Sequence, residues 1–142
     1  MKLSILMSSF GDGGVERMVI NTACGLSARG VDIRFFSGNP DGVHLDRLKP
    51  PIALEVLPSE SLPRMARLVQ HLRDEAPDAV LVAKAPDFRL ALKARRRAGC
   101  ATPIVMRPGT TITARVRGPA GRWKLWRLAR LYRRGDAIIA NS

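Results

Sequence analysis

The sequence predicts a single α/β domain built on one parallel, doubly wound sheet of the Rossmann-like type. Short apolar runs alternate with stretches of helical periodicity along the whole chain, the pattern of right-handed strand–helix–strand units. The 142 residues suffice for one buried core, and a hydrophobic content of 46% argues against a disordered chain. No repeat, low-complexity tract or linker divides the sequence, so we expect residues 1–142 to form one domain.

Six strands are expected. Each is a short apolar or β-rich run, and the unbroken AVLVA of the fourth is typical of a strand covered on both faces. A doubly wound sheet places such strands in the order 3-2-1-4-5-6. The expected strands occupy residues 2–8, 31–37, 52–57, 79–83, 103–107 and 136–140.

Four amphipathic helices are expected between the strands, at residues 15–29, 63–76, 88–98 and 121–134. Gly30 and Gly99 follow the first and the third, where helices commonly end. Strands two and three are joined instead by a loop, 38–51, with only a short apolar patch. Because the sixth strand ends the chain without a covering helix, we expect a fragment of a longer protein, interrupted after that strand.

The charge of the chain is distributed unevenly. The net charge is +12, yet residues 1–87 carry 10 Lys and Arg against 11 Asp and Glu, whereas residues 88–135 carry 14 Lys and Arg and no acid. An Arg-rich codon bias (19 Arg to 5 Lys) would not explain the missing acids. The asymmetry predicts an anionic partner for the second half: phosphates, nucleic acid or an acidic membrane surface.

Composition also sets expectations for compartment and metal binding. No apolar run approaches the roughly 20 residues that span a bilayer, and no signal-peptide pattern is evident, so cytoplasmic residence is expected. Cys24 and Cys100 form no CxxC pair and are expected as buried small hydrophobic residues. No metal site is expected.

A glycine-rich segment, SSFGDGGVER at 8–17, joins the first strand to the first helix. In a doubly wound sheet this turn lies at the carboxyl edge, where ligands bind. Glycines admit a ligand close to the backbone, and the helix N-terminus favours phosphate. Glu16 stands where GxGxxG requires glycine, and no Gly-Lys-Ser/Thr follows, so neither common nucleotide motif is present. A simple tight turn is the equally weighted alternative.

Four segments in this order resemble the N-terminal half of retaining GT-B glycosyltransferases of the group 1 type. The first joins Gly-Gly-x-Glu-Arg to a helix ending in Leu-x-x-x-Gly, and the last is an Asp-Ala-Ile-Ile-Ala strand. The matching residues are Gly13 to Arg17 with Asn21, Leu26 and Arg29-Gly30; Pro77 to Val80; Thr102 to Val105; and Asp136 to Ser142.

The resemblance implies an acceptor-side domain whose partner domain, absent here, binds a nucleotide-sugar donor. It implies transfer with retention to a cell-envelope glycan or lipid-linked acceptor, with no metal and no cofactor, and a fragment that is inactive alone. Many relatives carry a histidine after the fourth or fifth strand. Here the histidines are His44, in the loop after strand two, and His71, expected on a helix face, so no catalytic residue is assigned.

Candidate site residues follow the fourth and fifth strands. Lys84 and Asp87 are candidates for orienting acceptor hydroxyls, and Arg107 for gripping a phosphate or an anionic sugar bidentately. These three residues are also the candidates for a catalytic role. Gly109 has no side chain and so lets the loop after the fifth strand lie close to the sheet edge. With Gly13 and Gly14, Arg107 and Gly109 are the expected donor- or acceptor-binding residues. A solvated salt-bridge cluster is the alternative for each charged residue.

The helix at 121–134, GRWKLWRLARLYRR, predicts a contact surface. Tryptophans among arginines on its polar side suit a membrane interface, with rings at headgroup depth and cations over acidic lipids. The alternatives are tryptophans packed under a missing domain and, least favoured, nucleic acid. The expected core stripe is Leu125, Leu128, Ala129 and Tyr132; the expected membrane-binding residues are Trp123, Trp126, Arg127 and Arg130.

Two functions therefore remain open. The first is the acceptor-side domain of a sugar transferase that works as a peripheral protein on the inner membrane face. The second is a basic Rossmann-like module that binds anionic ligands or nucleic acid without catalysis.

Overall fold

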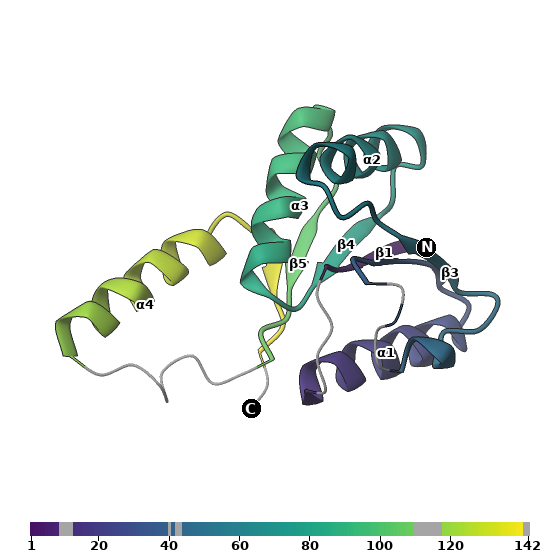
Figure 1. Ribbon diagram of the computed structural model, residues 1–142, viewed down its shortest axis with the longest axis horizontal. Helices are drawn as coiled ribbons and strands as arrows, with labels where there is room; N and C mark the ends of the chain where they lie inside the picture. The colour runs from purple at the N-terminus through teal and green to yellow at the C-terminus, as the bar shows by residue number, and fades with distance from the viewer. Residues whose placement is uncertain (9–12, 40, 42–43, 110–117, 141–142) are drawn as a thin grey trace.

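The computed structural model describes residues 1–8, 13–39, 41, 44–109 and 118–140, and its centre is one parallel sheet (Figure 1). The strand order is β3-β2-β1-β4-β5-β6, as the alternation of strands and helices predicts. Every strand pair is parallel, which confirms the doubly wound α/β class. The strands are β1 (Lys2–Met7), β2 (Asp32–Ser37), β3 (Ala53–Val56), β4 (Ala79–Val82), β5 (Ile104–Met106) and β6 (Ala137–Ile138).

Helices cover both faces of the sheet. Helix α1 (Gly14–Ser27) lies on one face, and α2 (Ser61–Asp74) and α3 (Ala85–Ala98) lie side by side on the other (Figure 1). Helix α4 (Gly118–Tyr132) projects away from the sheet. In the part of the chain that is described, no helix is long and apolar enough to cross a membrane.

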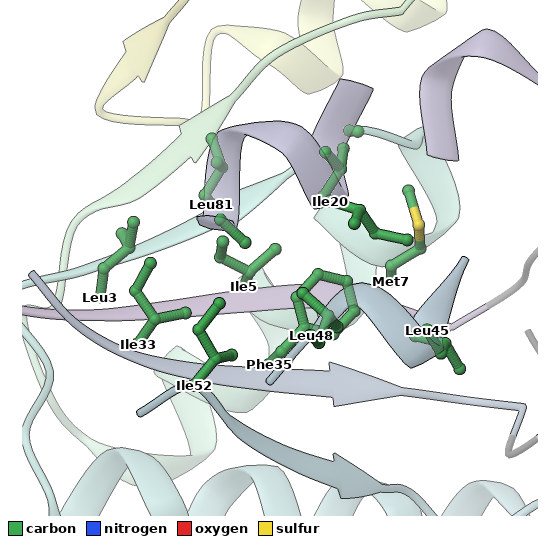
Figure 2. Close-up of a cluster of buried hydrophobic side chains, with 13 residues drawn as sticks. Leu3, Ile5, Met7, Ile20, Ile33, Phe35, Leu45, Leu48, Ile52 and Leu81 are labelled. Carbon is green, nitrogen blue, oxygen red and sulfur yellow. The ribbon is translucent and has the colours of Figure 1, made fainter. Parts of the chain in front are cut away.

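Alternate residues of the central strands feed two separate cores, because successive side chains of a strand point to opposite faces. Ile5 and Phe35 face α1, and the neighbouring Leu6 and Phe36 face α2 and α3. Figure 2 shows the core beneath α1, where Ile20 meets the strand residues.

The connection between β2 and β3 contributes to that same core. It contains a 3-10 turn, η1 (Leu45–Arg47), and its Leu45 and Leu48 belong to the same buried cluster as Phe35 (Figure 2). The apolar patch expected in this loop therefore takes the place that a crossover helix would fill.

Several local expectations need correction. Helix α3 begins at Ala85, three residues early, because extended Lys84 caps it and Pro86 suits its first turn. Asp87 thus lies in a helix and not in a loop. The core stripe expected on α4 is confirmed only at Tyr132, which packs against the core, because no α4 residue is buried and Ala129 is exposed. The cysteines, expected to be buried, are half-buried free thiols.

A polar chain fastens α2 to the sheet. His71, only 2% exposed, shares a 2.7 Å hydrogen bond between its Nε2 and Ser4 Oγ of β1, and its Nδ1 lies 3.4 Å from Glu75 Oε1. Glu75 pairs with Arg34 of β2 at 3.0 Å. The arrangement resembles a hydrolytic triad, but Ser4 is buried in the middle of a strand, and two cavities that Ser4 and His71 line are small, about 10 and 40 Å³. Its role is structural.

Acidification should weaken this fastening. Burial lowers the pKa of His71 below its ordinary 6.5, and nearby Arg34 and Arg67 lower it further, against an opposing effect of Glu75. Below about pH 6.5 the unfolded chain therefore binds a proton that the folded chain resists, and stability falls by at most about 1.4 kcal/mol per pH unit. Denaturant titrations at stepwise lower pH should show this fall, and His71→Leu should flatten it. An equally steep fall in the variant would exclude His71 as its source.

Candidate functional site

The candidate site lies at the carboxyl edge of the sheet, where β1, β4 and β5 end and where α1 and α3 begin. β1 pairs with β4, and β4 with β5, so Ser8, Lys84 and Arg107 follow three adjacent strands. This is the edge where doubly wound sheets bind ligands. The predicted site residues Gly13, Lys84 and Arg107 belong to the described parts of the segments that follow these strands, and their binding roles stay predictions.

A charge pair links the glycine motif to the fourth strand. Lys84 Nζ donates to Glu16 Oε1 at 2.6 Å, and Glu16 is only 5% exposed. A Cβ added at Gly13 would lie 2.7 Å from Glu16 Oε2, so glycine leaves room for this carboxylate to fold back over the start of α1. A negative charge at a helix N-terminus is stabilising. Here Glu16, which our sequence reasoning did not propose as a site residue, provides that charge.

A second link ties the glycine loop to α3. Asp87 Oδ1 accepts hydrogen bonds from the Ser8 hydroxyl and from the Ser8 N–H, the latter at 3.2 Å. Burial raises the pKa of Asp87, against the opposing effects of the Ser8 hydrogen bonds and of the charges on Lys84 and Arg64. Asp87 is 1% exposed, and in the described part of the chain its Oδ2 has no hydrogen-bond partner. The carboxylate therefore holds the end of β1 in place, and its assignment to the catalytic site stays a prediction.

Two glycines allow close approaches at this edge. A Cβ on Gly109 would lie 2.2 Å from Val15 Cγ2, so the loop after β5 rests on the first turn of α1. A Cβ on Gly38 would lie 2.1 Å from the backbone oxygen of Ser8, so the end of β2 abuts the start of the glycine loop. Gly109 thus lies against Val15, the residue after Gly14, whereas the close approach of Gly38 was not anticipated.

Arg107 lies at the same edge. Its backbone N–H donates to Val82 O at 2.8 Å, which extends the β4–β5 pairing by one step, and its residue surface is half-buried. Its role as an anion-binding residue remains a prediction.

A shallow, open groove of about 490 Å³ runs along the outer side of α1 from this edge, and α1 together with the turn after it provides the whole lining. Its lining carries arginines near both ends, hydroxyl and amide groups between them, and no acid. Sequence reasoning missed it, although the small residues at 14, 22 and 25 share a side of the helix. The lining residues are Gly14, Arg17, Met18, Asn21, Thr22, Gly25, Leu26 and Arg29.

Two aspartates of the sequence motifs have structural roles. Asp78 Oδ2 accepts from Lys2 N at 2.7 Å and so fixes the start of β4 beside β1. Asp136 Oδ2 accepts from Ile104 N at 2.8 Å and from Arg95 of α3. The hydrogen bond from Ile104 is the main cause that lowers the pKa of Asp136. Both aspartates order the sheet and do not belong to the site.

No metal centre is evident within the described ranges, where no three His, Cys, Asp or Glu side chains gather in a way that could hold an ion. The expectation of metal-independent, cofactor-free chemistry stays a prediction.

Comparison with known proteins gives the family. Residues 12–142 match the sequence model of Glycosyltransferase Family 4. No curated protein sequence matches the chain. Among solved structures, the fold is similar to Anabaena Alr3699/HepE in complex with UDP-glucose, with a TM-score of 0.75 and 22% identity. It is also similar to Acinetobacter baumannii MurG (TM-score 0.65, 16% identity) and to WaaB, a lipopolysaccharide outer core galactosyltransferase (TM-score 0.64, 21% identity).

These likenesses cover nearly all of this chain but a minor part of the others. They span 100%, 98% and 97% of the present chain, and 38%, 40% and 38% of HepE, MurG and WaaB. At such identities the likeness shows the fold alone, whereas the family match extends over most of the chain. The chain therefore belongs to glycosyltransferase family 4 and has the fold of a GT-B N-terminal domain.

Proposed function

We propose that residues 1–142 form the acceptor-side domain of a glycosyltransferase that moves a sugar from a nucleotide-sugar donor to a cell-envelope glycan or lipid-linked acceptor. The observation that carries this proposal is the family match over residues 12–142. A second Rossmann-like domain would hold the donor, and the domain described here would be inactive alone. Transfer with retention is part of the proposal, because the sequence motifs resemble those of retaining enzymes.

The geometry supports acceptor binding at the α1 groove. The groove opens at Gly14, on the edge that would face the donor, and continues along the helix for about four turns. Arg17 and Asn21 offer hydrogen-bond donors to hydroxyl or anionic groups, and Met18 and Leu26 offer apolar surface to sugar rings. A growing glycan would thus place its reactive end at the sheet edge.

The alternative, an anion-binding module without catalysis, gains no support from this edge. The helix N-terminus that would attract a phosphate already lies beside the Glu16 carboxylate, and this negative charge would repel an added phosphate. The family match favours the transferase.

Gly14→Val in the complete protein tests the proposal. No atom lies within 4 Å of a Cβ added at Gly14, so the new side chain should leave the unfolding free energy within about 0.5 kcal/mol while narrowing the groove mouth. We expect kcat/KM for the acceptor to fall by about tenfold or more, which corresponds to roughly 1.4 kcal/mol. Release of nucleoside diphosphate from UDP-glucose and other nucleotide sugars, with membrane glycans as acceptors, measures this.

Exposed Arg47, outside the groove, provides the matched control: Arg47→Val should retain activity. Full activity of Gly14→Val would show that the glycine loop is only a turn. Absence of sugar transfer by the unaltered complete protein from every donor tried would instead contradict the proposed function itself.

A further inference from the structure

Both ends of the glycine loop, residues 8–17, are anchored to the same short segment of the chain. Ser8, at the start of the loop, donates to Asp87 Oδ1 through its N–H and through its hydroxyl. Glu16, near the end of the loop, accepts from Lys84 Nζ at 2.6 Å. Lys84 is the N-cap of α3 and Asp87 lies in the first turn of that helix. The residues from Lys84 to Asp87 therefore form one anchor for both ends, the β4–α3 junction.

The two contacts are shielded from water at the loop. Asp87 is 1% exposed and Glu16 is 5% exposed. A hydrogen bond or ion pair in such a place is stronger than one in water, because solvent does not compete for its partners. Contacts that involve a charged group also have short, well-defined geometry. Each contact therefore fixes the position of a loop residue relative to α3.

The Asp87 carboxyl is not explained by stability alone. Burial raises the pKa of Asp87 despite the hydrogen bonds from Ser8, so the folded surroundings disfavour its charged form. In the described part of the chain its Oδ2 has no hydrogen-bond partner. Apolar side chains of similar volume often stabilise a buried position as well as charged groups do. The role of this carboxyl is better explained by the loop residue that it holds.

Gly13 is suited to the Glu16–Lys84 ion pair. Its φ of −86° and ψ of 160° are extended backbone that other residues adopt, so the backbone conformation does not require glycine. A Cβ at this position would lie 2.7 Å from Glu16 Oε2. Because that oxygen ends a flexible side chain, an added methyl group would displace the carboxylate from its place beside Lys84. Glycine at this position preserves the ion pair.

We propose, on the basis of the sugar-transfer function above, that the β4–α3 junction positions the glycine loop for ligand binding. Lys84 and Asp87 are then positioning residues that do not touch the substrate, in place of the expected role of orienting acceptor hydroxyls. They hold Gly13 and Gly14 at the edge of the sheet where ligands bind. A loop that is ordered in advance loses less conformational entropy when a ligand binds. The junction raises affinity and takes no part in bond making.

The order of Gly13 and Gly14 tests the proposal without an assay of sugar transfer. Backbone nitrogen relaxation of the 142-residue chain should give order parameters of about 0.85 at both glycines, as in rigid backbone. Asp87→Ala should lower them below about 0.6. Asp87→Asn should keep them, because asparagine Oδ1 still accepts from Ser8 and the amide replaces Oδ2, which has no partner among the described residues. Asp74→Ala, at an exposed aspartate of α2, is the matched control and should change neither glycine.

Variants of the ion pair separate loop order from stability. Glu16→Gln with Lys84→Met removes both charges together, so the chain should retain much of the parent's stability. The order parameters of Gly13 and Gly14 should nevertheless fall, because the end of the loop is no longer anchored. Gly13→Ala should lower the order parameter of Gly14 in the same way, by displacing the Glu16 carboxylate. Lys93→Met, at an exposed lysine of α3, should leave both properties unchanged.

The complete protein provides the functional measurement. Asp87→Ala should raise the KM for the nucleotide sugar or for the acceptor and lower kcat/KM by about tenfold or more, with kcat changed by less than about threefold. Asp87→Asn should restore kcat/KM to within about threefold of the parent. A side chain that touched the reacting atoms would instead lose kcat in both variants, because the amide cannot exchange a proton as a carboxyl does.

Two results would overturn the proposal. One is unchanged order at Gly13 and Gly14 in every variant. The other is an equal loss of kcat in Asp87→Ala and Asp87→Asn, which would make Asp87 a catalytic residue. A complete protein that transfers no sugar would contradict the proposed function alone, because the relaxation measurements would still decide whether the junction orders the loop.

Discussion

Replacing Lys84 by Met should lower the free energy of unfolding by about 3 kcal/mol. The change removes the ammonium group that lies 2.6 Å from the Glu16 carboxylate, in a place where Glu16 is 5% exposed and water replaces little of the lost interaction. The Lys84 side chain is itself 25% exposed, so we expect the lower end of the range for buried ion pairs. Denaturant titration of the 142-residue chain measures the loss.

A double-mutant cycle tests whether the pair itself is responsible. Glu16→Gln combined with Lys84→Met should recover much of the stability lost in Lys84→Met, because no uncompensated carboxylate remains. Lys93→Met, at an exposed position of α3, should change stability by less than about 0.5 kcal/mol. Additive effects of the two changes at Glu16 and Lys84 would contradict a coupled pair.

Gly38→Ala should destabilise the domain by about 2–3 kcal/mol. The new Cβ would sit 2.1 Å from the Ser8 backbone oxygen, and backbone at the end of a central strand cannot move aside as a flexible side chain can. Any displacement of Ser8 would also disturb its two hydrogen bonds to Asp87. Thermal and denaturant unfolding give the magnitude.

Gly14→Ala is the matched control. Nothing lies within 4 Å of a Cβ there, and the residue begins a helix, so we expect unchanged or slightly higher stability. If Gly38→Ala were as stable as Gly14→Ala, β2 and the glycine loop would not be in the close contact described here. Unchanged Ser8–Asp87 hydrogen bonds in a crystal structure of Gly38→Ala would likewise show that the added methyl group does not displace Ser8.

Much of the fold was predictable because periodicity is a local property of the chain. β1 and β4 are buried along most of their length and require cover on both faces, and the intervening amphipathic helices supply it. The boundaries were less predictable. Helix α3 begins at Ala85 because Lys84 continues the extended conformation of the strand before it, and the Lys84 side chain pairs with the distant Glu16. The helical periodicity of α4 was predicted correctly. Whether its leucine side is buried depends on which other elements pack against that side, and the periodicity does not show this.

The candidate site was predictable in place but not in detail. The carboxyl edge follows from topology, so Gly13, Lys84 and Arg107 could be placed near one another. The roles of Glu16 and Asp87 could not, since each depends on a partner at least 68 residues away in the chain. No single-sequence signal shows which distant groups will meet.

The sequence by itself determined the class of fold, the strand order, the family resemblance and the position of a tryptophan- and arginine-rich helix. Each of these follows from local spacing, from side-chain type or from charge counts. Only the tertiary structure decided that Glu16 pairs with Lys84, that Asp87 is buried against Ser8, and that a groove follows α1. These features arise where separate segments converge, because burial, steric room and ion pairing are properties of the space between elements and not of any one of them.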